Sequence, residues 1–260
     1  MKLIHFDWAI KKLLRHKENF GILEGFLTEL LKFDLKIERI LESEGNQEEQ
    51  RDKFNRVDIL VRTTKGELVL VELQNTPETD YFQRMLYGVS KLLTEYFKLG
   101  ESYERIKRFY SINIVYGSFG QGEDYIYQHQ GSFVGTHSKD NLENENFPKY
   151  YILKVNNFDD VVKNTLDEWI YFLKKSEVKD EFKAKGMEEV REKMCYEKLD
   201  KDSKIAYNRF QENLRIAKSI IETGRKTTIL EIAKDFKNAG IAIHEIAKST
   251  GLSEEEINDL

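Results

Sequence analysis

Residues 57–74 are predicted to form two apolar strands joined by a tight turn, and this hairpin constrains the fold more than any other segment. Both flanks are rich in Val, Leu and Ile and end in polar residues, which is typical of β-strands. Thr64-Lys65-Gly66 suits a type I turn followed by a left-handed residue, because glycine takes a positive φ without steric cost. This turn pairs Thr63 with Glu67 and thereby sets the register of the whole hairpin.

The same register brings acidic side chains together. It places Asp58 opposite Glu72, with Cβ atoms about 5 Å apart on one face of the sheet, and Gln74 two residues further on shares that face. Like charges directly opposite each other are destabilising, and a divalent cation such as Mg²⁺ or Mn²⁺ would relieve the repulsion because both prefer oxygen ligands. A shared proton is the alternative, and a slip of one residue would send the two carboxylates to opposite faces.

An Asp, a hairpin turn and Glu-x-Lys form the core motif of the PD-(D/E)XK nuclease superfamily, which this sequence resembles through Asp58 and Glu72-Leu73-Gln74. The flanking segments DKFNRVDILV (52–61) and DYFQRMLYG (80–88) make the chain look like the Rpn family of recombination-promoting nucleases and transposases. The resemblance covers most of the chain. It implies an α/β fold with a restriction-endonuclease-like mixed sheet flanked by helices, and hydrolysis of phosphodiester bonds in DNA with Mg²⁺ or Mn²⁺.

The resemblance also implies roles for individual residues. Asp58, Glu72 and Gln74 are the expected catalytic residues, and the expected metal ligands are Asp58, Glu72, the backbone carbonyl of Leu73, and Glu24 from the first helical region. For Glu24, a favourable position near a helix N-terminus is the alternative explanation. Gln74 stands where the superfamily has Lys; it is neutral and cannot act as a general base. A catalytically weak protein of this fold that binds DNA or protein is therefore the alternative function.

Three basic residues are candidates for contact with DNA. Lys53 and Arg56 precede the first acidic residue of the motif, where a cation can hold a substrate phosphate, and ordinary surface charge is the alternative. Arg84 lies in a helix predicted at 81–99 and is expected to contact phosphate or to orient Glu72.

Composition limits the class of protein. The net charge of −5 argues against indiscriminate binding to nucleic acid, although a local basic groove is compatible with that total. The single Cys195 excludes an internal disulfide and fits a reducing cytoplasm. The sequence shows no apolar signal region and no apolar segment of membrane-spanning length, so we expect a cytoplasmic protein without membrane contact.

A nuclease-like domain is expected at residues 1–175 and an all-helical, charged C-terminal tail at 176–260. Besides the hairpin and the helix at 81–99, the expected elements are two helical pieces within 6–41, strands at 109–116, 124–134 and 150–155, and a helix at 158–175. The tail resembles a helix-turn-helix and ends with a capping box at Ser253 and Glu256. Because the last helix is acidic, packing or homo-oligomerisation through these C-terminal helices is favoured over DNA reading.

Overall fold

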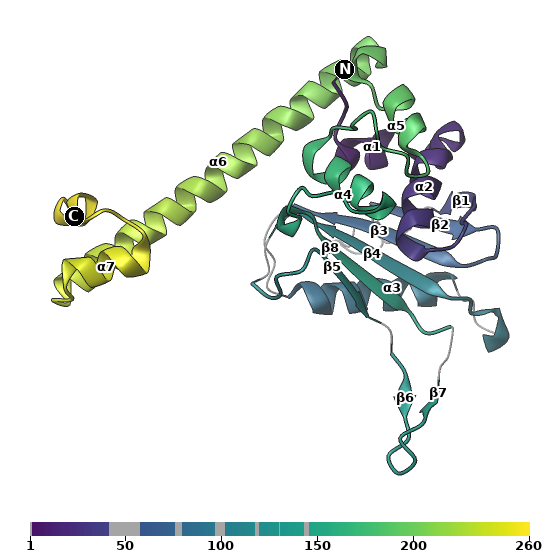
Figure 1. Ribbon diagram of the computed structural model, residues 1–260, viewed down its shortest axis with the longest axis horizontal. Helices are drawn as coiled ribbons and strands as arrows, with labels where there is room; N and C mark the ends of the chain where they lie inside the picture. The colour runs from purple at the N-terminus through teal and green to yellow at the C-terminus, as the bar shows by residue number, and fades with distance from the viewer. Residues whose placement is uncertain are drawn as a thin grey trace. The chain divides into compact units, whose positions relative to one another are not determined.

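The computed structural model describes residues 2–41, 58–75, 80–96, 102–117, 120–129, 131–142 and 146–260. The chain divides into two compact units, Met1–Leu199 and Asp200–Leu260. The first unit is built on a six-stranded sheet in the order β1-β2-β3-β4-β8-β5 (Figure 1). Its strands are β1 (Ile37–Leu41), β2 (Ile59–Thr63), β3 (Leu68–Gln74), β4 (Phe109–Val115), β5 (Ile126–His129) and β8 (Lys149–Lys154), and a separate ribbon comprises β6 (Phe133–Val134) and β7 (Asn141–Leu142).

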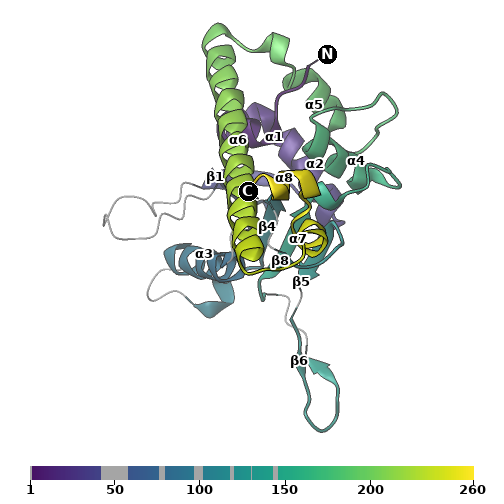
Figure 2. The ribbon, with the colours of Figure 1, turned by 90° about the vertical axis from the view of Figure 1, so that its left-hand side faces the viewer.

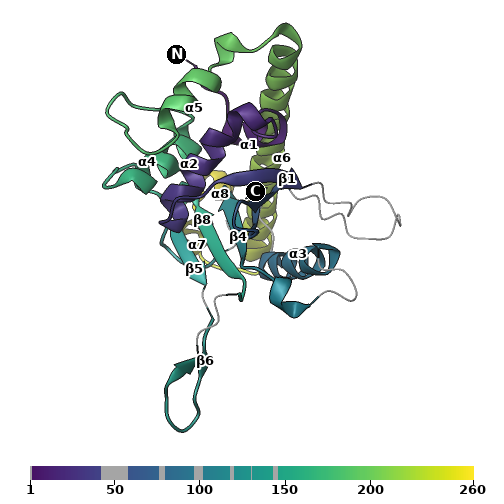
Figure 3. The same ribbon diagram turned by 90° about the vertical axis from the view of Figure 1, so that its right-hand side faces the viewer.

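Helices cover both faces of this sheet. One face carries α3 (Tyr81–Tyr96), and the other carries α1 (Phe6–Lys12), α2 (Phe20–Leu31), α4 (Thr165–Lys175) and α5 (Met187–Lys193) (Figures 1 and 3). Under α3, Leu70 of β3 packs with Val89 and Leu92. On the opposite side, the rings of Phe26 and Trp169 lie 5.5 Å apart between α2 and α4. The predicted α/β fold, with helices flanking the sheet, is therefore confirmed.

The pairing at the centre of the sheet follows the predicted register. β2 and β3 are antiparallel, with Ile59 opposite Val71. The amide of Thr63 donates to the carbonyl of Glu67 at 2.9 Å, and Gly66 has a φ of 82°, as its place in the turn requires. β3, β4 and β8 are parallel to one another, whereas β1 and β5 pair antiparallel with their neighbours, so the sheet is mixed as predicted.

Three elements differ from the sequence predictions. The strand predicted at 124–134 is divided, because residues 126–129 form β5 of the main sheet and residues 133–134 form β6 of the separate ribbon. Residues 37–41, which lie in the predicted helical region, form β1 at the edge of the sheet and pair antiparallel with β2. The helix predicted to begin at Phe158 begins at Thr165, because the side chain of Asn164 accepts the amide N–H groups of Leu166 and Asp167 and caps the helix there.

The first unit also extends beyond the boundary predicted at residue 175. The amide of Ile4 donates to the carbonyl of Met194 at 2.8 Å, so the segment after α4 returns to the N-terminal helices. At Gly25 of α2 an added Cβ would lie only 2.7 Å from the Cα of Gly186. Such a close approach leaves no room for a side chain, and it joins residues 176–199 to the nuclease-like unit.

The second unit consists of α6 (Lys201–Asn238), α7 (Ile243–Thr250) and α8 (Glu254–Asn258) (Figure 2). Ala233, Ile246 and Ile257 form its buried cluster. The predicted capping box of Ser253 and Glu256 is present at the start of α8. Within the described part of the chain, none of the helices combines the length and the apolar character that crossing a bilayer requires.

Candidate active site

Asp58 lies immediately before β2, and its side chain is bound to the end of β3. Its Oδ2 accepts the amide N–H of Leu73 at 2.7 Å. In an antiparallel ladder, alternate residues direct both their N–H and their C=O toward the partner strand. The carbonyl of Leu73 therefore points to the same side of β3 as the amide that Asp58 binds. This contact places the first acidic residue of the motif against Glu72-Leu73-Gln74.

Cationic side chains surround Asp58. The ammonium of Lys11, on α1, lies 3.4 Å from Oδ1 of Asp58 and 2.8 Å from Oδ1 of Asp7. The guanidinium of Arg15 donates to the backbone carbonyl of Asp58 at 2.6 Å. Asn75, which directly follows β3, donates to Oδ2 of Asp7 at 2.7 Å. Two acidic groups and two cations thus lie between α1 and the ends of β2 and β3.

The pKa shifts follow from this arrangement. Burial raises the pKa of the Asp58 carboxyl, and the charge of Lys11 and the Leu73 amide only partly oppose that effect. Burial alone would lower the pKa of Lys11, but the contacts with Asp7 and Asp58 outweigh it and raise the pKa. Lys11 therefore stays an ammonium, and Asp58 is a carboxyl group whose charged form would be favoured by a further cation.

Glu72 and Gln74 lie on the face of the sheet that α3 covers. Glu72 is buried beside Asn113 in the parallel register of β3 and β4. The hydroxyl of Tyr81, at the start of α3, donates to Oδ1 of Asn113 at 3.0 Å. This hydrogen bond holds the start of α3 over the paired residues Glu72 and Asn113. The guanidinium of Arg84 donates to the side-chain oxygen of Gln74 at 3.4 Å. Arg84 thus brings positive charge to the end of β3.

Glu24 lies away from this site, so its expected role as a metal ligand is corrected. Its carboxylate accepts the amide of Ile37 at 2.8 Å and the ammonium of Lys36 at 2.8 Å. Ile37 pairs with Thr63, and Asp58 is five residues from Thr63, or about 16 Å along an extended strand. Glu24 is also the fifth residue of α2, beyond the first turn where the helix dipole acts. Its contacts instead hold the beginning of β1.

Residues 4–224 match a family described as PD-(D/E)XK nuclease family transposase. The chain belongs to this family. The match extends from the residues before α1 into α6, so it includes the hairpin, the site around Asp58 and the segment that closes the first unit. No curated protein and no solved structure matches the chain. The resemblance drawn from the sequence motif is thereby confirmed, as is a function of the nuclease or transposase type.

By chemical type, the oxygen donors expected at this site suit a divalent cation. Within the described residues, no group of three or more His, Cys, Asp or Glu side chains could hold a metal ion. The expected set has two acidic side chains, Asp58 and Glu72, and takes a third oxygen from the Leu73 carbonyl. All are hard oxygen donors of the kind that Mg²⁺ and Mn²⁺ prefer, and Lys11 already sets a positive charge against Asp58. That these groups converge on one ion stays a prediction.

Asp7, Lys11 and Arg15 were not predicted from the sequence to lie near Asp58. Asp7 and Lys11 are four residues apart, the spacing of a favourable ion pair on a helix, and Arg15 follows four residues later. That spacing was the available signal, but nothing in it indicates a contact with the hairpin. Lys53 and Arg56, which were expected to contact DNA, lie outside the described residues, and their role stays a prediction.

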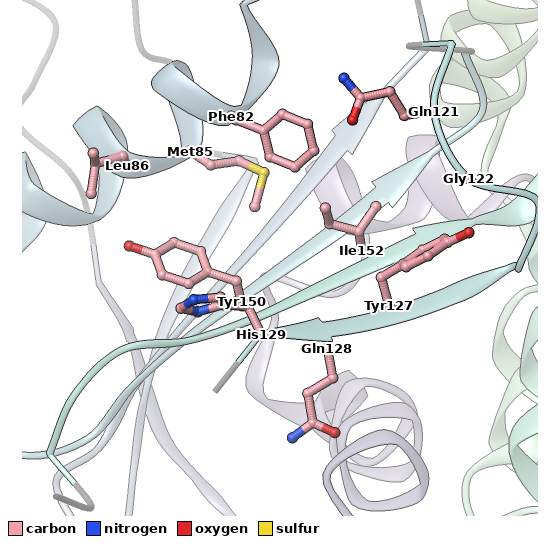
Figure 4. A pocket seen from close by; sticks show the side chains of 10 residues that line it. All are labelled: Phe82, Met85, Leu86, Gln121, Gly122, Tyr127, Gln128, His129, Tyr150 and Ile152. Atoms are coloured by element: carbon pink, nitrogen blue, oxygen red, sulfur yellow. The ribbon is translucent and has the colours of Figure 1, made fainter. Parts of the chain in front are cut away.

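A separate apolar pocket of about 470 Å³ lies between α3 and strands β5 and β8. Figure 4 shows Phe82 and Met85 of α3 directed toward Tyr150 and Ile152 of the sheet. Phe82 and Leu86 of α3 are 46% and 61% exposed. No acidic side chain is among the described residues that line this pocket.

Proposed function

We propose that this family member is a metal-dependent endonuclease that hydrolyses phosphodiester bonds in DNA. The observation that carries the proposal is the hydrogen bond between Asp58 and the amide of Leu73, which joins the acid before β2 to the Glu72-Leu73-Gln74 segment. This contact supports the alignment that a shared cation needs. Membership of a nuclease family supports hydrolysis as the reaction class.

In this proposal the carboxylates of Asp58 and Glu72 and the carbonyl of Leu73 would hold Mg²⁺ or Mn²⁺. Such a cation, when bound, lowers the pKa of a coordinated water and neutralises charge on the phosphate. Arg84 supplies a fixed positive charge for the phosphate backbone of the substrate, because Gln74 holds its guanidinium at the end of β3. Positive charge is needed there, since the chain as a whole carries a net charge of −5.

Gln74 acts in this proposal by positioning Arg84. Its side-chain oxygen is already an acceptor for the guanidinium, and an amide has no proton equilibrium that would allow general-base catalysis. This feature also keeps open the second function, a catalytically weak protein of nuclease fold that binds DNA without cutting it. The two functions differ in one measurement, which is cleavage under conditions where DNA is bound.

The test is nicking of supercoiled plasmid with Mg²⁺ or Mn²⁺, compared with a chelator. Asp58→Asn is the informative variant because its side-chain oxygen can still accept the amide of Leu73 while the charge is lost. We expect the nicking rate to fall at least about 100-fold, as for loss of a group that stabilises charge in the transition state. Asp180→Ala, which removes an exposed acid elsewhere, should cut like the wild type. Equal nicking by Asp58→Asn would refute the proposed site.

A further inference from the structure

The last residue of β3 is Gln74, which carries no positive charge. Gln74 occupies the position that Lys holds in the motif the chain resembles, and its amide is neutral at every pH of interest. A neutral side chain cannot offset the negative charge that grows on a phosphate during hydrolysis. If the site cuts DNA, that charge has to come from other elements, and Arg84 of α3 is one source.

An ammonium from α1 reaches the same end of the sheet. Lys11 lies 2.8 Å from Asp7 and 3.4 Å from Asp58, so the shorter contact anchors it and the longer one directs it toward the hairpin. Asp7 is itself fixed, because Asn75 donates to its second oxygen at 2.7 Å. The anchor therefore depends on a residue directly after β3, and the position of Lys11 is coupled to the motif.

Exposure separates Lys11 from the groups that hold it. The side chain of Lys11 is 44% exposed, whereas those of Asp7 and Asp58 are 7% and 15% exposed. A lysine that served only as a buried counter-ion would be enclosed with its partners. This one extends from solvent to the site, where an approaching phosphate could meet it. Its neighbour Lys12 is also exposed, but among the described residues it forms no ion pair with Asp7 or Asp58.

We propose that Lys11, held by Asp7, supplies from α1 the positive charge that Gln74 cannot provide, and donates a hydrogen bond to the scissile phosphate. The inference rests on the proposed nuclease function. Hydrolysis adds water across the bond between phosphorus and the leaving oxygen: the hydroxyl goes to phosphorus and the remaining proton to the leaving oxygen. Lys11 keeps its own proton throughout, and it stabilises negative charge as a fixed donor.

The same geometry gives a consequence that does not depend on cleavage. Because Lys11 and a divalent cation would both bind the carboxylate of Asp58, they oppose each other there. A unit charge 3.4 Å from a carboxylate changes the affinity of a competing cation by about tenfold, even with the full screening of water. Removing the ammonium should therefore strengthen metal binding while it weakens catalysis.

The experiment compares Lys11→Met, Lys11→Arg and the matched control Lys12→Met in the full chain. Mn²⁺ affinity is measured by titration calorimetry, and plasmid nicking is measured at saturating Mn²⁺ and saturating DNA. We expect Lys11→Met to bind Mn²⁺ about tenfold more tightly and to nick at least about 100-fold more slowly at saturation. Lys11→Arg should recover part of the rate, and Lys12→Met should match the wild type in both measurements.

Wild-type nicking by Lys11→Met at saturating Mn²⁺ would overturn the catalytic role. Unchanged Mn²⁺ affinity in that variant would show that the ammonium does not face the cation site, and would overturn the placement. Failure of the nuclease proposal itself looks different: the wild type would then fail to nick DNA, while the tighter Mn²⁺ binding of Lys11→Met would still locate Lys11 at the site. Thermal unfolding of each variant identifies any effect that comes from folding.

Discussion

Replacing Glu24 tests whether this buried acid is structural, as its contacts indicate. In Glu24→Ala the amide of Ile37 loses a charged acceptor, which costs about 1.5–3 kcal/mol. The pair with Lys36 adds at most about 1 kcal/mol, because the lysine side chain is 55% exposed. In a domain of this size each kcal/mol lowers Tm by about 2–4 °C. The expected fall is therefore roughly 3–16 °C by the same scaling.

Two further variants make the test specific. Glu24→Gln keeps an oxygen for the amide of Ile37 and should lose less stability than the alanine variant. Lys36→Met removes only the exposed pair and should lower Tm by less than about 4 °C. All three variants are measured by circular dichroism on heating and by Mn²⁺-dependent nicking at a temperature where each is folded. Loss of nicking in Glu24→Gln with an unchanged Tm would refute the structural role and return Glu24 to the metal site.

Two other predictions concern packing and pH. Gly25→Ala should destabilise the first unit by about 1–3 kcal/mol, because the added Cβ would meet the backbone of Lys185 and Gly186. Gly224→Ala should stabilise α6 by up to about 1 kcal/mol, because nothing lies close to this glycine in the helix. Equal changes of Tm for the two variants in thermal melts would contradict this reasoning. Burial raises the pKa of the Asp58 carboxyl in the folded state, so the folded protein binds the carboxyl proton more tightly than the unfolded chain does. The contribution of Asp58 to stability therefore falls as pH rises from the ordinary pKa of 3.8 through the raised pKa of the folded state. In chelator, Asp58→Asn should therefore match the wild-type Tm below this interval and exceed it above, and a lower Tm for the variant at neutral pH would count against that sign.

The hairpin could be predicted because its information is local. A three-residue turn ending in glycine fixes which residues pair, and the pairing of Ile59 with Val71 followed from it. The strand β1 could not be found in the same way. Ile37 and Leu41 are its buried residues and lie four apart, a spacing that also suits one face of a helix. Only pairing with β2, which is a tertiary contact, decides between the two.

The candidate site could likewise be predicted only where its residues lie in the local hairpin motif. Asp58 and Glu72 belong to a motif that is contiguous in the hairpin, whereas Lys11 meets Asp58 only because α1 docks on the sheet from 47 residues earlier in the chain. On α3 the apolar residues do not all face the sheet. Phe82 and Leu86 are exposed, whereas Tyr81, Met85 and Val89 are buried. Adjacent helical positions differ by about 100° in direction, so the hydrophobic pattern alone did not resolve which stripe faces the sheet.

The return of residues 194–196 to the N-terminal segment has a consequence for how the chain is made. Leu3 and Cys195 form an isolated antiparallel β-bridge, and the amide of Tyr196 donates to the carbonyl of Lys2 at 2.9 Å. During synthesis, these contacts between the N-terminal segment and residues 195–196 cannot form until almost two hundred residues have been translated. The hairpin of β2 and β3 is therefore translated long before the contacts that join residues 2–4 to residues 194–196 can form, and α1, which carries Asp7 and Lys11, directly follows those N-terminal residues.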